Sequence, residues 1–346
     1  MLRNYQENDE GKINQLFYEV FKTNRSIAEW QWKFSHPTNH RSLISVYEEG
    51  GEIIGHAALL IFEGQIESRP VLFGERVDVM VHPGHQGKGM YKKVIHHLMQ
   101  QCEEHNIDLV YGYPAPKAKD LFIRYMDGKE ITYVPRLLKV LSPGKLIMSR
   151  FGFLQKASLI FNGVDKVISN KRRSLPDALS VTQIDHADIR FDEIWEEGRK
   201  DHSILLTRNA SFINWRYISH PSREYEVYIV ENQSAAIGYI VLKKEIMDKG
   251  NETMELIHVI DLFFSDRGQN RKDMSNALHH ITKRADLVST WSLPNTAQDQ
   301  LFKKSAFIRV SSPMPLVGKT MNKELDDSFI YNSANWYVSQ GDVDSY

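Results

Sequence analysis

Short motifs recur in the same order, at a nearly constant distance, along this chain of 346 residues. The recurring pairs are Trp32 to His36 with Trp215 to His220, Val77-Asp78 with Ile260-Asp261, His96-His97 with His279-His280, Asp108 with Asp286, and Leu121-Phe122 with Leu301-Phe302. Their offsets lie between 178 and 184 residues. Because chance similarities do not keep one offset, we interpret the chain as two copies of a domain of about 180 residues.

Each copy is expected to combine a mostly antiparallel sheet with flanking helices. Alternating apolar runs near 43–46, 53–62 and 70–81, with turns at Gly50-Gly51 and Glu63-Gly64, predict an antiparallel meander. Helical and strand patterns alternate after it. The sequence therefore predicts a mixed α/β fold, with a first domain at 1–141, a helical basic linker at 142–178, and a second domain with a C-terminal tail at 179–346.

A glycine-rich loop joins the predicted strand at 77–81 to a helix that begins near Met90. Gly87 and Gly89 allow the backbone to approach a ligand, and the first-turn amides of the helix are unpaired donors that favour phosphate. Lys88 and Lys92 add positive charge. The spacing fits neither a P-loop nor the dinucleotide fingerprint, whose third glycine is replaced by Lys92.

The loop resembles motif A of the Gcn5-related N-acetyltransferases (GNAT), in which Gln or Arg is followed by two residues, Gly, one residue, and Gly or Ala. The match runs from Gln86 to Tyr91, after a hydrophobic strand and the letters VHP. Tyr91 departs from the small last residue, which affects how closely the helix packs against a pyrophosphate. The whole chain is similar to tandem GNAT proteins of the enhanced-intracellular-survival group, sharing WKF..HP, IIGHAAL, VDVMVHPGHQGKGMYKKV and VYGYP.

This resemblance implies an N-acetyltransferase that uses acetyl-CoA as co-substrate and acetylates a primary amine of a small molecule by direct attack on the thioester. Pantetheine is expected to pair with the strand at Val79, Met80 and Val81. The pyrophosphate is expected on the amides of Gln86, Gly87, Lys88, Gly89, Met90 and Tyr91.

Two carboxylates in the strand beside the expected thioester are candidates for the general base, Glu75 and Asp78. Because side chains alternate along a strand, only one of them can face the cleft unless a bulge intervenes. Asp78 has a counterpart, Asp261, in the other copy, which suggests a structural role and favours Glu75. A backbone amide near Met80 is the candidate donor to the oxyanion.

Many GNAT enzymes use a tyrosine on the following helix as general acid, but this chain has Phe122 at the matching position. Tyr125 lies nearly one turn further on and is the candidate replacement, with water as the alternative. Tyr111 and Tyr113, at the end of the preceding strand, are further candidates.

The second copy differs where the first carries its phosphate loop. Asn270 and Lys272 replace Gly87 and Gly89, and Asp273 stands at the start of the helix. Side chains and a carboxylate at these positions oppose phosphate binding. We therefore expect the second copy to serve packing, dimerisation or the shape of the acceptor pocket.

The composition favours a soluble globular protein, which we expect to be cytoplasmic. Hydrophobic residues make up 42% and charged residues 25%, and the net charge of -1 gives no bulk attraction for nucleic acid. No apolar segment suggests a leader or an integral membrane span. A single cysteine, Cys102, is expected to be buried, and the spacing of the nearby histidines predicts no metal site.

Two segments and the overall activity stay open. The linker, with its basic cluster at Lys171 to Arg173, fits a helical connector or a membrane-surface segment, and the aromatic and acidic tail fits a lid over the first cleft or a docked terminus.

A homodimer is possible. The alternatives to acetyl transfer are a non-catalytic acyl-CoA-binding regulator or scaffold, and a cell-wall type aminoacyltransferase that uses charged tRNA, which the intact loop disfavours.

Overall fold

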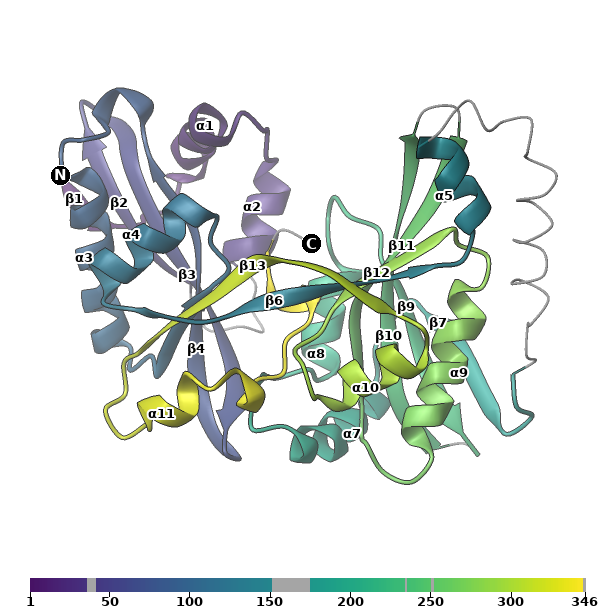
Figure 1. Ribbon diagram of the computed structural model, residues 1–346. Coiled ribbons are helices and arrows are strands. Elements are labelled where there is room, and N and C mark those ends of the chain that lie inside the picture. The colour runs from purple at the N-terminus through teal and green to yellow at the C-terminus, as the bar shows by residue number, and fades with distance from the viewer. Residues whose placement is uncertain (36–41, 151–174, 234, 250–251, 345–346) are drawn as a thin grey trace.

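The computed structural model describes residues 1–35, 42–150, 175–233, 235–249 and 252–344 (Figure 1). A mixed sheet of 13 strands runs through both halves, and helices cover its two faces. Most neighbouring strands are antiparallel, while β4 with β5 and β11 with β12 are parallel. The predicted mixed α/β fold is confirmed.

The first half begins with a short strand and two helices and continues with the predicted meander. Its elements are β1 (Leu2–Asn4), α1 (Glu10–Phe21), α2 (Ile27–Phe34), β2 (Leu43–Glu49), β3 (Glu52–Ile66), β4 (Arg69–Val81), η1 (Pro83–His85), α3 (Met90–Glu104), β5 (Leu109–Gly112), α4 (Pro116–Met126) and β6 (Lys129–Val140). Helix α5 (Pro143–Arg150) follows, and the rest of the predicted linker, 151–174, lies outside the described residues.

The second half repeats this order of elements, with η3 and β8 added after its first helix. It contains β7 (Leu179–Ile184), α7 (Ile189–Gly198), η3 (Arg199–Asp201), β8 (Ile204–Leu206), α8 (Ala210–Ile213), η4 (Asn214–Ile218), β9 (Glu226–Asn232), β10 (Ala235–Lys249), β11 (Glu252–Phe264), α9 (Asn270–Thr282), β12 (Leu287–Trp291), α10 (Ala297–Lys304) and β13 (Ile308–Thr320). A tail follows with α11 (Asp327–Ile330), η5 (Ser333–Asn335) and η6 (Gln340–Asp342).

The last strand of each half completes the sheet of the other half. Strand β6 pairs with β12, from Arg136↔Trp291 to Val140↔Leu287, and β13 pairs with β5, from Val317↔Gly112 to Thr320↔Leu109. The two exchanged strands also pair with each other in the middle of the molecule (Figure 1). This exchange joins the halves through backbone hydrogen bonds, in addition to side-chain packing.

Alternation along the strands places different helices on the two faces of the sheet. In β3, Ala58, Leu60 and Phe62 belong to the same core as α1 and α2, whereas Ala57, Leu59 and Ile61 belong to the core beneath α3 and α4. The first of these cores also includes residues of α7, α8 and β10. The α1–α2 face of the first half therefore meets the α7–α8 face of the second, and we call this the inner face.

Two equivalent tryptophans meet at the centre of the inner face. Trp32 and Trp215 stack with ring centroids 5.2 Å apart. The indole of Trp32 donates to the Trp215 carbonyl oxygen at 2.8 Å, and the indole of Trp215 donates to the Trp32 carbonyl oxygen at 3.0 Å. Because each residue makes the same contact with the other, this pair marks a pseudo-twofold relation between the halves.

The C-terminal tail lies between the halves on the inner face. Trp336, Tyr337, Val338 and Val343 are buried, and the backbone N–H of Tyr337 donates to the Ile204 carbonyl oxygen of β8. The tail then continues toward β4, where Asp344 contacts Glu75. Within the described residues, no helix is both long and apolar enough to span a membrane.

Candidate active site

A bulge in β4 brings Glu75 and Asp78 to the same face of the sheet. The register with β3 changes from Ala58↔Val77 to His56↔Met80, so β4 has one extra residue there. Asp78 has a positive φ of 47°, and its carbonyl oxygen lies 2.7 Å from Nδ1 of His56. Without a bulge, side chains three residues apart on a strand would point to opposite faces. With the bulge, the side chains of Glu75 and Asp78 both lie on the inner face.

Asp78 is held by two cations of the α1–α2 region. Its carboxylate forms ion pairs with Arg25 and with Lys33, whose Nζ lies 2.9 Å from Oδ1. Burial alone would raise the pKa of Asp78, but Lys33 and Arg25 outweigh burial and lower the pKa below its ordinary value. A carboxylate of low pKa with two bound cations is a weak proton acceptor and a strong structural anchor.

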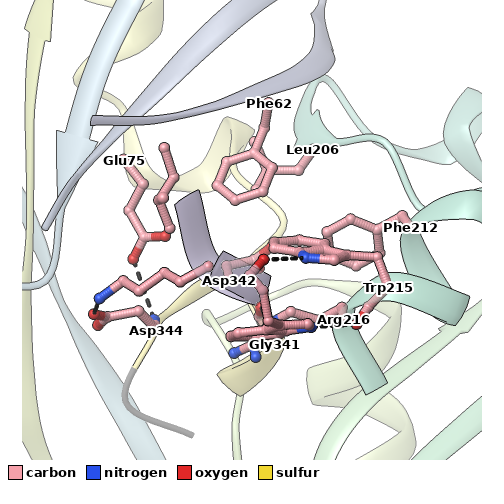
Figure 2. Close-up of a pocket in the computed structure, with 12 residues that line it drawn as sticks. Phe62, Glu75, Leu206, Phe212, Trp215, Arg216, Gly341, Asp342 and Asp344 are labelled. Carbon is pink, nitrogen blue, oxygen red and sulfur yellow. Dashed lines mark hydrogen bonds and ion pairs between the residues drawn. The ribbon is translucent and has the colours of Figure 1, made fainter. Parts of the chain in front are cut away.

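Glu75 faces Asp344 of the tail (Figure 2), and its electrostatic environment differs from that of Asp78. Its side chain is 4% exposed, and the backbone N–H of Asp344 donates to Oε1 at 3.3 Å. Burial, reinforced by the Asp344 carboxylate, raises the pKa of Glu75 well above its ordinary value. Raised carboxyl pKa values of this kind are typical of general bases.

A small cavity of about 10 Å³ adjoins Glu75 on the inner face. It is lined by Lys33, Trp32 and Trp215 and by tail residues that include Asp344 (Figure 2). Lys33 joins the tail to β4, because its Nζ also lies 2.6 Å from the Asp344 carboxylate. In this arrangement the tail closes the inner side of the site and leaves room for about one water molecule.

A much larger groove of about 530 Å³ lies on the opposite, outer face of β4. The predicted cofactor-binding residues that line it are Val79, Val81, Gln86, Gly87, Gly89, Met90 and Tyr91. Met80 instead packs into the inner core, and Lys88 donates from Nζ to the Gly84 carbonyl oxygen at 3.1 Å. The groove is also lined by Lys92 and Lys117.

The loop before α3 has the geometry of an anion cradle. Gly87 and Gly89 have φ values of 78° and 75°, and a Cβ at either position would meet no atom within 4 Å. Gly89 is the N-cap residue of α3 and makes no side-chain cap, so the first-turn amides are available to a ligand. Open space, a positive helix terminus and nearby lysines fit a pyrophosphate.

Strands β4 and β5 part immediately after Glu75. Their parallel pairing runs from Phe73↔Leu109 to Glu75↔Tyr111, while β4 continues to Val81. The segment from Arg76 to Val81 therefore has no β5 partner along this edge, and an extended ligand can pair with it. Glu75 lies at the point where the opening begins, with the groove on one face and the small cavity on the other.

The tyrosines considered as general acids are divided between the two faces. Tyr125 lines the outer groove, with its ring centroid 5.4 Å from that of Tyr91. Tyr111 is buried in the inner core, and its hydroxyl has no hydrogen-bond partner among the described residues. Burial and the nearby Glu75 raise the pKa of Tyr111 well above its ordinary value. Phe122 is buried.

The equivalent centre of the second half is filled by protein. Asp261 pairs with Arg208 at 3.1 Å and accepts hydrogen bonds from Tyr217, Tyr239 and the tail residue Tyr337. The loop is also occupied, because Asp273 lies buried in the first turn of α9 and accepts from the Asn232 amide at 2.6 Å.

Sequence reasoning did not identify three residues of these sites, namely Lys33, Arg76 and Asp344. Lys33 lies within the repeated tryptophan motif, which could have drawn attention to it, but its contact with Asp344 joins residues 311 positions apart. His36 of the same motif lies outside the described residues. Among the residues that the structure describes, no group of three or more His, Cys, Asp or Glu side chains could hold a metal ion.

Comparison with known protein families gives a match to the first third of the chain. Residues 1–118 match the family model described as acetyltransferase (GNAT) domain. This part of the chain is therefore similar to a GNAT acetyltransferase domain, and the match covers about a third of the 346 residues. A comparison with curated proteins found no match.

Several solved structures resemble nearly the whole chain in fold. A GCN5-related N-acetyltransferase from Anabaena variabilis has a TM-score of 0.67 and 13% identity, with 93% of this chain and 73% of that chain covered. A GCN5-related N-acetyltransferase from Kribbella flavida has a TM-score of 0.61 and 15% identity, with 92% and 71% covered. A conserved protein of unknown function from Enterococcus faecalis has a TM-score of 0.66 and 9% identity, with 92% and 72% covered. At these identities the likeness concerns the fold alone.

Proposed function

We propose that the protein is an acyl-CoA-dependent N-acyltransferase that transfers an acyl group, acetyl in the sequence-based prediction, to a primary amine of a small molecule. One observation carries the proposal: the glycine-lined groove at the start of α3 runs to the opening between β4 and β5, where the buried Glu75 lies. The GNAT domain match at residues 1–118 supports the same reaction class.

The donor is expected to lie along the outer groove. Its pyrophosphate would accept hydrogen bonds from the first-turn amides of α3 and the loop at 86–91, and its pantetheine would pair with the free edge of β4 at Val79–Val81. The glycines are needed there because a side chain at either position would occupy the space of the phosphate. Lys92, which lines the groove, adds positive charge.

The transfer needs one proton acceptor and one proton donor. The amine nitrogen forms a bond to the thioester carbonyl carbon, the carbon–sulfur bond breaks, and the thiolate takes a proton. Glu75 is the proposed base that accepts the amine proton, whereas Asp78, paired with Arg25 and Lys33, holds β4 in its bulged conformation. A β4 amide near Met80 remains the candidate oxyanion donor, and Tyr125 or water the candidate acid.

The acceptor needs more room than the inner face provides. A cavity of about 10 Å³ admits no amine substrate, so Asp344 has to move away from Glu75 before an acceptor can approach from that side. The same closed cavity favours a second candidate function, a protein that binds acyl-CoA without turnover. The closer kinship with the enhanced-intracellular-survival group, a homodimer and a cytoplasmic location remain predictions.

The test is release of free CoA thiol from acyl-CoA in the presence of a panel of primary amines, with product detection by mass spectrometry. We expect turnover by wild type and by Glu103→Gln, an exposed control, and loss of turnover in Glu75→Gln. Tight CoA binding with no product from any amine would contradict the enzyme and favour the binding protein. Full activity of Glu75→Gln would contradict its role as base.

A further inference from the structure

Arg76 lies at the β5 end of the outer groove, and no carboxylate among the described residues forms an ion pair with it. It is the first residue of β4 beyond the last pair with β5, and its side chain points to the outer face with Tyr91 and Val79. The side chain is 9% exposed. A guanidinium remains charged at neutral pH even when burial lowers its pKa, as it does here, so this position holds a buried cation.

The contacts of Arg76 leave much of its charge uncompensated. Nη1 donates to the Tyr91 hydroxyl at 2.9 Å, and the guanidinium lies 5.0 Å from the centroid of the Phe122 ring. Nε is buried and has no hydrogen-bond partner among the described residues, and no described carboxylate forms an ion pair with it. Arg25 and Arg208, by contrast, pair directly with Asp78 and Asp261. Burying a cation without an anionic partner is costly, and an anionic ligand bound to Arg76 would lower that cost.

The second half shows that the fold does not need a cation at this position. At the offset of 183 residues, Val259 replaces Arg76 and Met274 replaces Tyr91. Both are buried in one apolar cluster with Phe302, the counterpart of Phe122. The arginine is therefore found in the half with the open glycine loop, and an apolar side chain in the half without it. This difference suggests that Arg76 serves ligand binding, since the sheet of the second half packs without a cation at this position.

The position along β4 indicates which part of the donor Arg76 would meet. From Val81, beside the phosphate loop, to Arg76 the strand spans about 16 Å. The phosphates are expected at the loop end and the thioester near the Met80 amide, so Arg76, further along β4 toward the last pair with β5, lies on the acyl side of the thioester. Guanidinium groups bind carboxylates through paired hydrogen bonds.

We propose that Arg76 determines acyl specificity, binding the terminal carboxylate of a coenzyme A thioester of a dicarboxylic acid. The inference rests on the proposed function and refines its donor from an acetyl to a carboxyacyl group. The transfer step is unchanged: the same carbon–nitrogen bond forms, the same carbon–sulfur bond breaks, and the distal carboxylate stays bound to Arg76.

The test compares CoA, acetyl-CoA, succinyl-CoA and butyryl-CoA by calorimetric titration. The butyryl group has nearly the length of the succinyl group but lacks its terminal carboxylate. The variants are Arg76→Met, which introduces an apolar side chain as in the second half, and Arg124→Met, an exposed control on α4. We expect succinyl-CoA to bind wild type and Arg124→Met at least tenfold more tightly than butyryl-CoA, and this ratio to fall to about one in Arg76→Met.

The outcomes separate this inference from the proposed function. If CoA itself fails to bind wild type, the donor site and the inference fall together. If CoA binds but wild type does not prefer succinyl-CoA to butyryl-CoA, the inference is overturned and the donor site stands, a result that does not depend on any variant. A preference that persists in folded Arg76→Met would also overturn the role of Arg76.

Discussion

The two halves share one order of elements but differ at the turn from the long strand into the following helix. Before α3, Gly87 and Gly89 have left-handed backbone conformations and open space around them. At the start of α9, Asn270 and Lys272 stand at the equivalent positions, and the buried Asp273 occupies the first turn. One copy of the fold thus keeps an anion cradle, while the other fills the same place with its own side chains.

The inner centres differ in a similar way. Asp78 and Asp261 each pair with an arginine from the equivalent position, Arg25 and Arg208. Tyr337 of the tail then completes the second centre, whereas the first keeps Glu75 beside a small cavity. The buried aspartate–arginine pair occurs in both halves, whereas the glycines, Glu75 and Arg76 occur in the first half alone. This difference is consistent with the proposed ligand site in the first half.

The largest expected effect concerns Glu75, whose equivalent in the second half is His258. We expect Glu75→Gln to lower kcat by about 10²- to 10⁴-fold, because the amide cannot accept the proton. Because the pKa of Glu75 is raised, the wild-type rate should increase with pH until the carboxyl ionises, and the residual rate of the variant should lack this step. A steady-state pH–rate profile measures both.

The same raised pKa sets the sign of a stability effect. A carboxyl whose pKa is higher in the folded state than its ordinary value of 4.5 binds more protons when folded. The contribution of Glu75 to the free energy of unfolding therefore decreases as pH rises above about 4.5. Over that range, wild type should lose stability relative to Glu75→Gln. An opposite trend in urea unfolding would show that Glu75 ionises more readily in the folded protein.

The next effect concerns the two buried aspartates. We expect Asp78→Asn and Asp261→Asn each to lower the free energy of unfolding by about 3–5 kcal/mol, because each leaves a buried arginine with fewer anionic partners. Chemical denaturation monitored by circular dichroism measures the change. Since the pKa of Asp78 is lowered, its contribution should persist above its ordinary value of 3.8 and be lost as pH falls below it. A change near zero in either variant would deny that the pair maintains the fold.

A matched pair of glycine substitutions tests the loops. Gly89 and Gly268 both have positive φ, 75° and 53°, and space for a side chain, and they precede α3 and α9. We expect Gly89→Asp to weaken CoA binding at least a hundredfold, about 2.8 kcal/mol, because a carboxylate would cap the free amides and repel phosphate. Gly268→Asp carries the same charge and a similar strain, and calorimetry should show unchanged affinity. Equal losses in both would indicate a general effect of charge or strain.

The smallest effect concerns the reciprocal tryptophans. Trp32→Phe and Trp215→Phe each remove one hydrogen bond of the pair, and we expect each to lower stability by about 1 kcal/mol. In a double-mutant cycle the two changes should couple by about 0.5 kcal/mol or more, since the rings stack. Strict additivity would show that the two halves do not depend on this contact.

The sequence predicted the local features of this molecule and missed those that join distant residues. The meander, the glycine loop and the alternation of helices follow from periodicity and turn residues, and the structure confirms the mixed α/β fold. The exchange of β6 and β13 could not be predicted from the sequence. The hydrophobic pattern of a strand indicates that it pairs, but not which half supplies its partner. The domain boundaries at 141 and 179 stay a prediction.

In the candidate site too, the sequence predicted local features and missed contacts between distant residues. The residues of the loop that line the groove could be predicted from the sequence, because glycine favours backbone conformations that other residues rarely adopt. Glu75 and Asp78 lie on the same face because of a bulge in β4, and no residue type in the sequence predicts that bulge. The contact of Asp344 with Glu75 depends on the path of the tail. The unpaired charge of Arg76 is visible only when its surroundings are known.

The most direct test of the central claim is the stoichiometry of CoA binding to the wild-type chain by calorimetric titration. The account predicts one CoA molecule per chain, because one of the two copies keeps the glycine cradle and the other is filled by its own side chains. Two equivalent sites per chain would contradict the difference between the halves. A titration with no heat of binding at any temperature tested, and no change in thermal stability with CoA, would contradict the donor site itself.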